Sequence, residues 1–439
     1  MSGDPHTQQH PKGSRNAARL VTTPAERKRG LVILFVSLVC MGAGQSVIYT
    51  ILPPLGRQLG LVPTQITSIF AASAVIWIFS SAFWGVRSDR WGRKPVMLQG
   101  LAAFAVSFAC FATVMHAGIN NWIPAYLIFP ALIFSRCIYG TFGSGTSASA
   151  QAYVADRTTP SERLRGISII SMAFAFGTTF GPVIGSSLTL FGLYVPFYFI
   201  AAWAFLSGLA IWYFLPERTP PKSQAVRKTT LRWYEPRMFP FMAFGLVMSL
   251  IGSIPIQTSG FFFQDVLHLN AHMTAAYTSI GLMAADMAAL FAQFVVVQRM
   301  GLSSRVLTIT GICITVLSNT FFIFVQDFPT LVLAMIMSGL GFGMARPGFT
   351  SGASLAVSPH EQGAVAGLLN AAGAAGFIFG PMIGWLYEFS PRVPYIFGVI
   401  AMLSLLAAQF ISRVLRNAGQ IPPDMEAIEE PTESPVPNN

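Results

Sequence analysis

One carboxylate of the sequence lies deep inside an apolar stretch. Asp286 stands in Leu-Met-Ala-Ala-Asp-Met-Ala-Ala-Leu, 13 residues before Arg299. A helical rise of about 1.5 Å per residue would place Asp286 about 20 Å from the end that Arg299 marks. An acid at this depth can bind and release a proton near neutral pH, which is the chemistry of proton coupling. The alternative is an Asp that pairs with a buried Arg, or is held neutral by a polar neighbour, for packing alone.

Two arginines also lie inside apolar stretches. Arg136 has Gly140 four residues further on, and Arg346 lies in the segment Gly-Phe-Gly-Met-Ala-Arg-Pro-Gly. Charged side chains are costly inside a membrane, so those that occur there are functional candidates. The alternative for Arg136 is a side chain that reaches the outer interface, because it lies nearer that end of its stretch.

The stretches that hold these charges are numerous enough to define the fold class. Hydrophobic residues make up 53% of the 439 residues and charged residues 10%, whereas soluble domains carry about 25% charged residues. A membrane-spanning helix needs about 20 mostly apolar residues. Twelve stretches qualify: 31–52, 66–86, 95–115, 123–148, 165–190, 194–215, 239–263, 274–297, 303–325, 329–352, 362–388 and 393–414. The sequence therefore predicts an all-α polytopic membrane protein.

The basic residues predict the orientation of these spans. If the N-terminus is cytoplasmic, the outside loops hold only Arg57 and Arg392 of the 27 Lys and Arg residues. Cytoplasmic loops of membrane proteins carry the excess of Lys and Arg. Both termini are therefore expected in the cytoplasm, and the net charge of +10 needs no nucleic-acid partner. The polar start of the chain lacks the apolar run of a signal peptide.

A polar interruption between the sixth and seventh spans divides the chain into two halves. The expected divisions are a cytoplasmic basic tail 1–30, a six-helix bundle 31–217, a cytoplasmic linker 218–238, a second six-helix bundle 239–416 and a disordered cytoplasmic tail 417–439. The halves repeat each other, with Gly-Thr-Thr-Phe-Gly-Pro-Val-Ile-Gly at 177–185 and Gly-Phe-Ile-Phe-Gly-Pro-Met-Ile-Gly at 376–384. Two parallel halves predict a solute site between them near the membrane midplane.

The loop after the second span carries the most specific motif, Gly-Val-Arg-Ser-Asp-Arg-Trp-Gly-Arg-Lys at 85–94. Asp89 is the lone acid among four bases and is expected to pair, Gly85 would let the helix end approach a neighbour, and Gly92 would permit a tight turn. The alternative is a generic basic loop. The motif resembles the signature of the major facilitator superfamily, where it latches the two halves on the cytoplasmic side. The matching residues are Gly85, Asp89, Arg90, Gly92, Arg93 and Lys94.

Two further segments resemble motifs of the same superfamily. Arg136 resembles the Arg of its fourth-helix motif, which implies a role in proton coupling beside Asp286. A second set resembles the Gly-Pro motif typical of antiporters that export drugs, namely Gly177, Gly181, Pro182 and Gly185. A simple packing face is the alternative for that set, because residues 376–384 repeat the pattern. Both halves resemble the twelve-span drug–proton antiporter branch, which includes tetracycline efflux pumps.

The resemblance also implies which residues line the solute path. In the superfamily, spans one, four, seven and ten line the cavity, which here gives Gln45, Tyr49, Arg136, Gln257, Thr258 and Arg346. Several members of the branch carry an acid in the first span, and this chain has none there. The run Phe261–Phe263 would bind an amphipathic solute or form an interfacial belt.

The leading functional hypothesis is a proton-coupled exporter of a small organic molecule, monomeric in the plasma membrane, here a bacterial inner membrane. A proton-coupled importer of a nutrient or metabolite on the same fold is the alternative, since fold fixes neither substrate nor direction. A non-transporting sensor or scaffold ranks below both, because it would not need intramembrane Arg and Asp. The spans exclude a soluble enzyme, and no phosphate-binding Gly-Lys-Ser/Thr loop suggests ATP-driven pumping. The scattered Cys and His residues predict no metal site, and no cofactor is expected.

Overall fold

The structure is a computed structural model that describes residues 23–158, 160–217, 235, 238–355, 357 and 361–416. The described residues are helical throughout apart from turns, and twelve helical segments are long and apolar enough to cross a membrane. The prediction of twelve spans is confirmed. The first span begins earlier than the sequence predicted, at Pro24, because Thr23 and Glu26 form a reciprocal helix cap.

The first half consists of seven α-helices and a short 3-10 turn that together form six spans. They are α1 (Pro24–Gln58), α2 (Pro63–Trp91), α3 (Arg93–Ile119), α4 (Ala125–Phe142), α5 (Thr146–Arg157), α6 (Pro160–Leu188), η2 (Thr189–Phe191) and α7 (Val195–Phe214). The fourth span is divided into α4 and α5 by a turn at residues 143–145, where the sequence is Gly-Ser-Gly. Glycine destabilises a helix relative to alanine, which favours the break at this point.

The second half contains the other six spans. They are α8 (Phe239–Leu267), α9 (Ala271–Phe291), η3 (Ala292–Val297), α10 (Ser304–Phe324), α11 (Phe328–Leu355), α12 (Gln362–Ala375), η4 (Gly376–Phe379), α13 (Gly380–Phe389), α14 (Val393–Ile411) and α15 (Arg413–Arg416). The eighth span ends in the π-helical segment η3, and the eleventh is interrupted by the 3-10 turn η4. Interruptions of this kind often occur at functional sites.

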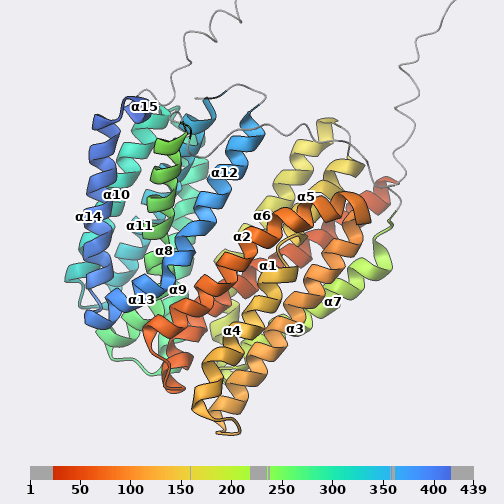
Figure 1. Ribbon diagram of the computed structural model, residues 1–439, viewed down its shortest axis with the longest axis horizontal. Coiled ribbons are helices and arrows are strands. Elements are labelled where there is room, and N and C mark those ends of the chain that lie inside the picture. Colours follow the sequence, from red (N-terminus) through yellow and green to blue (C-terminus); the bar gives the residue numbers. More distant parts are fainter. Residues whose placement is uncertain are drawn as a thin grey trace, which may run out of the picture.

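The two bundles meet at one end and diverge at the other. Figure 1 shows them spreading apart toward the end where α1 begins and α15 lies. At the opposite end, a Cβ on Gly260 of α8 would lie 2.8 Å from Pro53 of α1. The backbone N–H of Thr64 in α2 also donates to Glu388 of α13 over 3.0 Å. The molecule is therefore closed at the end opposite the start of α1.

The three phenylalanines at 261–263 belong to the packed interior of the closed end. Each is 0% exposed, so they form neither an interfacial belt nor a wall of the open side. Phe262 packs edge-on against Tyr395, with ring centroids 4.9 Å apart, and Phe261 packs against Tyr387 of α13 at 5.5 Å. The sequence suggested that this run binds an amphipathic solute or forms an interfacial belt, and in the structure it instead packs inside the closed end.

Candidate functional site

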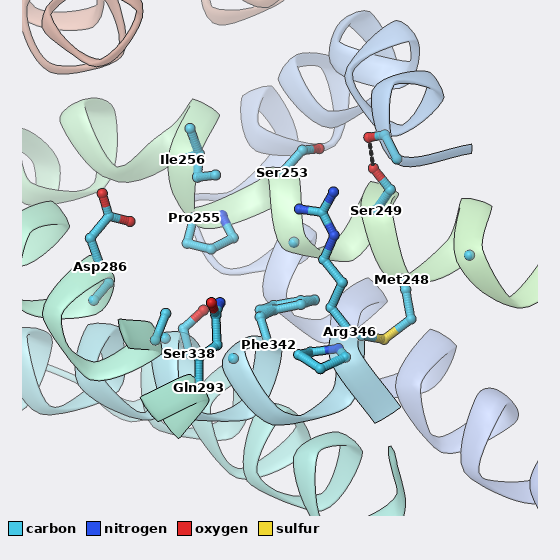
Figure 2. Close-up of a pocket in the computed structure, with 18 of the residues that line it drawn as sticks. Met248, Ser249, Ser253, Pro255, Ile256, Asp286, Gln293, Ser338, Phe342 and Arg346 are labelled. Atoms are coloured by element: carbon cyan, nitrogen blue, oxygen red, sulfur yellow. Dashed lines mark hydrogen bonds between the residues drawn. The ribbon is translucent and has the colours of Figure 1, made fainter. Parts of the chain in front are cut away.

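A cavity of about 650 Å³ lies in the second half and is lined by α8, α9, η3, α11, α12 and η4. Asp286 and Arg346 are the only charged residues among the described residues that line it. Figure 2 shows the two charged groups on different sides of the cavity, with Phe342 and Ser338 between them. The cavity therefore offers one acid, one base and an aromatic surface to the same solute.

Asp286 connects the cavity to the other half of the molecule. Its carboxyl group lies near the side chain of Thr179 in α6, and Thr179 is 2% exposed. The Thr179 hydroxyl also donates to the Ala175 carbonyl oxygen over 2.9 Å. A hydroxyl has one proton to donate, so Thr179 cannot donate to Ala175 and to an ionised Asp286 at once. A protonated Asp286 can instead donate to Thr179 while Thr179 keeps its bond to Ala175.

Arg346 is the cation of the cavity and is exposed to it. Figure 2 shows its guanidinium directed toward the side of α8 that carries Ser249 and Ser253. A Cβ on Gly373 of α12 would lie 3.5 Å from Nη2 of Arg346. Arg346 forms no ion pair with any described residue, so its charge is available to a bound group.

Arg136 lies behind the cavity rather than in it. The residue is 1% exposed, which places it in the core of the first bundle and not at an outer interface. Its Nη2 lies 3.4 Å from Oε1 of Gln45 and 3.5 Å from Oγ of Ser73, while Nε and Nη1 have no partner in the described part of the chain. Gln45 in turn donates to the Tyr49 hydroxyl over 3.0 Å.

Tyr49 joins this buried group to the cavity wall. Its ring stacks on Phe377 of η4, with the ring centroids 5.8 Å apart, and Phe377 lines the cavity. Gln45, Tyr49 and Arg136 thus form a continuous polar chain that ends at the cavity wall. All three were expected to line the solute path. None of them lines this cavity, and their part in the solute path stays a prediction.

The two expected residues of α8 are also buried. Gln257 and Thr258 are both 0% exposed. Gln257 donates to Ser253 over 3.0 Å, and Ser253 lines the cavity. Thr258 lies 2.9 Å from the Tyr395 hydroxyl inside the second bundle. Of the six expected liners, only Arg346 reaches the cavity in this conformation.

The Gly-Pro motif of α6 lies between two other helices. A Cβ on Gly177 would overlap the Val39 carbonyl oxygen, and a Cβ on Gly181 would come within 2.6 Å of the Ala43 Cα, so α6 and α1 cross in direct backbone contact. On its other side α6 contacts α9, where Ser279 donates to the Pro182 carbonyl oxygen over 2.8 Å. The motif therefore packs within its own half and also joins the two halves.

The repeated motif has an equivalent position in the second half. A Cβ on Gly380 would lie 2.7 Å from the Thr67 carbonyl oxygen in α2, and one on Gly384 would lie 2.7 Å from the Thr64 Cα. Both copies thus lie where the halves touch. Gly185, the last residue of the first copy, faces α1 again, with 2.8 Å between its would-be Cβ and Val47.

The residues of the latch motif pair within the first half. Asp89 forms an ion pair with Arg93 over 2.6 Å, and Arg93 also contacts Asp156 of α5 over 3.3 Å. The Lys94 ammonium donates to two carbonyl oxygens at the end of α7, those of Trp212 and Leu215. These contacts connect α2, α3, α5 and α7 at the diverging end. The expected role of the motif as a latch between the two halves stays a prediction.

The glycines of the latch motif differ from each other. Gly92 has a φ of 101°, in the region that favours glycine, and forms the turn between α2 and α3 as expected. A Cβ on Gly85 would meet no heavy atom within 4 Å. The close approach expected at Gly85 is therefore not made in this conformation. The side chain of Arg90, the motif's remaining member, makes no ion pair with a described residue.

Residues 34–381, and again residues 287–434, match the model of the Major Facilitator Superfamily. The chain belongs to the major facilitator superfamily. Members of this family are secondary transporters of small molecules and not enzymes, so this protein is a multi-pass integral membrane transporter with twelve spans.

Two relatives that match this chain over most of its length are named for drug resistance. Multidrug resistance protein 2 of Bacillus subtilis is 25% identical over 405 residues, covering 89% of this chain and 97% of that protein. Tetracycline resistance protein, class C, of Escherichia coli is 27% identical over 371 residues, covering 80% and 88%. The expected resemblance to the drug–proton antiporter branch is thereby confirmed.

A solved structure shows the same fold. The crystal structure of the nucleoside transporter NupG superposes with a TM-score of 0.72 at 16% identity, covering 88% of this chain and 99% of that chain. At this identity the likeness establishes the architecture of the superfamily alone. The predicted fold of two six-helix bundles is confirmed.

Sequence reasoning missed one group at the closed end. Arg57 at the end of α1 forms a two-point ion pair with Asp265 of α8, with Nη2 2.8 Å from Oδ2, and Asp265 also accepts from the Tyr387 hydroxyl over 2.6 Å. These three residues, here called the outer clamp, join the two halves. The sequence offered one signal for this group, because Arg57 is one of only two arginines in the loops expected outside. Asp265 gave no such signal, because the seventh span was predicted to end before it, at residue 263.

Proposed function

We propose that this superfamily member is a proton-coupled exporter of a small organic solute. The observation that carries the proposal is the position of Asp286, which lines the cavity and also lies near Thr179 of the opposite half. The volume of about 650 Å³ lies within the range of about 300–1,000 Å³ of small-molecule sites. The names of the full-length relatives, multidrug and tetracycline resistance proteins, support export.

The proton would act on the contact between the halves. With Asp286 protonated, its carboxyl group could donate to the nearby Thr179 hydroxyl while Thr179 keeps its bond to the Ala175 carbonyl oxygen. With Asp286 ionised, Thr179 could donate to the carboxylate only by giving up its bond to the Ala175 carbonyl oxygen. The two protonation states therefore stabilise the interface unequally, and a ligand or proton shifts a conformational equilibrium only through such a difference. This is the link that coupled transport requires.

Arg346 would recognise the solute. A guanidinium without an ion-pair partner attracts an anionic or electron-rich group, and the neighbouring Phe342 and Phe377 offer apolar faces to the rest of the molecule. The expectation of an anion preference had rested on Arg136 and Arg346 together. Since Arg136 is outside the cavity, the preference is assigned to Arg346.

The diverging end would face the cytoplasm. The positive-inside rule places the termini there, so the conformation would be open to the cytoplasm and closed to the outside, in a bacterial inner membrane. Single cysteines at Ser14 and Ser434 test this sidedness. Neither should react with an impermeant thiol reagent added to intact cells, and reaction from outside would contradict the orientation.

Replacement of Asp286 tests the function. Asp286→Asn keeps the size and polarity of the side chain but cannot exchange a proton. In proteoliposomes it should lose accumulation driven by a pH gradient while keeping downhill solute exchange. Asp327→Asn is the matched control, because Asp327 lies at the start of α11 and caps Thr330 outside the cavity. If Asp286→Asn still accumulates solute against its gradient in response to pH, the proposal is wrong.

A further inference from the structure

A second cavity, of about 330 Å³, lies at the diverging end of the first bundle. It is formed by the start of α1, the end of α5, the start of α6 and Pro216 after α7. Its wall is apolar where it enters the bundle, with Leu31, Leu34 and Ile169. None of the residues that line the solute cavity belongs to it, so it is a separate site.

The charges around this second cavity are predominantly positive. Four basic residues line it, Arg27, Lys28, Arg157 and Arg165, against a single acid, Glu26. The Glu26 carboxylate accepts a hydrogen bond from the backbone N–H of Thr23 over 2.9 Å as part of the helix cap of α1. The cavity therefore has an excess of positive charge that attracts anions.

Arg157 is a buried charged residue in the wall of this cavity. The residue is 8% exposed, although it carries a full charge. Its guanidinium lies over the Tyr153 ring, 3.6 Å from the centroid, and Nη2 donates to the Pro216 carbonyl oxygen over 2.8 Å. Nη1 is buried and has no hydrogen-bond partner among the described residues. A buried guanidinium N–H without an acceptor is costly unless a ligand supplies one.

We propose that the second cavity binds a phosphate-bearing anion, with the phosphate on Arg157 and on the basic rim. Guanidinium groups bind phosphate oxygens in a geometry that matches their paired N–H donors. The adjacent apolar wall would receive the first carbons of an attached glycerol and acyl chain. The phosphate has two sources, an anionic phospholipid headgroup or a free phosphate, and basic pockets between membrane helices are known to take headgroups.

The test measures binding to the purified full-length protein in detergent. The probes are dioctanoyl phosphatidylglycerol, dioctanoyl phosphatidylcholine as the lipid without net charge, and inorganic phosphate. Phosphatidylglycerol should bind more tightly than phosphatidylcholine and raise the melting temperature. Binding of phosphatidylglycerol alone assigns the site to a lipid, and equal binding of inorganic phosphate assigns it to the free anion. If neither phosphatidylglycerol nor inorganic phosphate binds, the proposal is overturned.

Variants place the binding at this cavity. Lys28→Gln combined with Arg165→Gln removes two exposed rim cations and should weaken phosphatidylglycerol binding by about 25-fold, since each basic residue near a membrane surface contributes about a fivefold effect. Arg299→Gln combined with Arg416→Gln removes the same charge from exposed positions of the other half and should leave binding unchanged. Arg157→Gln should abolish it. If the two double variants bind equally, the cavity is not the site, and this result does not depend on how Arg157→Gln folds.

Discussion

Opening of the closed end must break the outer clamp, because Arg57 belongs to the first half and Asp265 to the second. Arg57→Gln removes the ion pair, while Tyr387 can still donate to Asp265 over its 2.6 Å contact. The packed residues around the clamp, such as the Gly260 contact with Pro53, are unaffected. The substitution should therefore favour the conformation that is open to the outside without unfolding the closed end.

The size of the effect follows from how exposed the pair is. The Arg57 and Asp265 side chains are 26% and 30% exposed, so they are neither on the open surface nor fully buried. Ion pairs on open surfaces contribute about 0–1 kcal/mol, and hydrogen bonds to charged groups about 1.5–3 kcal/mol. A value of about 1.5 kcal/mol lies between these cases and corresponds to roughly a tenfold increase in the outward-open population.

The assay is a distance measurement between spin labels on the outer loops of the two halves. Labels at Asn121, after α3, and His268, after α8, in a background without native cysteines should show the longer distance about ten times more often in Arg57→Gln. Arg392→Gln is the control, since Arg392 lies at the same end, is exposed and forms no ion pair with a described residue. Exchanging the charges, with Arg57→Asp and Asp265→Arg, should restore the original distribution. An unchanged distribution in Arg57→Gln would refute the reasoning.

Substitutions at Asp89, Gly181 and Arg346 each have an expected outcome. Asp89→Asn should impair transport with near-normal expression, because Arg93 loses its 2.6 Å partner; normal flux in vesicles would argue against a latch. Gly181→Leu should destabilise the protein by about 1–3 kcal/mol through overpacking against Ala43, which would be measured as a lower melting temperature. The control Gly85→Ala should leave the stability unchanged. Equal effects of the two substitutions on the melting temperature would contradict the close crossing of α6 and α1. Arg346→Gln should weaken the competition of organic anions for transport more than that of quaternary ammonium compounds. An equal loss for both classes of compound would contradict the assignment of the anion preference to Arg346.

Most of the architecture could be predicted because it depends on local properties. Each span is an apolar run of sufficient length, and the halves are visible as repeats, so neither requires knowledge of packing. The breaks in the spans were harder to predict. The Gly-Ser-Gly turn at 143–145 lies within an apolar run that reads as one helix, and the π-helical segment Ala292–Val297 has no distinctive composition.

The site was predictable only in part, because burial alone does not say which way a side chain faces. Asp286 was identified from its depth in the span and does line the cavity. Arg136 was identified by the same reasoning and instead faces the interior of its own bundle. Ser249 and Gln293, which line the cavity, have no sequence signal, since small and polar residues occur throughout the spans. Their role depends on how α8 and η3 are rotated, which only the packed structure determines.

The direction of proton movement during solute transport tests the central claim most directly. Proteoliposomes of uniform orientation, with a pH-sensitive dye inside and no imposed gradient, are given a solute gradient, and the internal pH is followed. Proton-coupled export predicts that protons move opposite to the solute, and that Asp286→Asn abolishes the pH change. Protons that move together with the solute, or no pH change while the wild-type protein transports solute, would contradict the account.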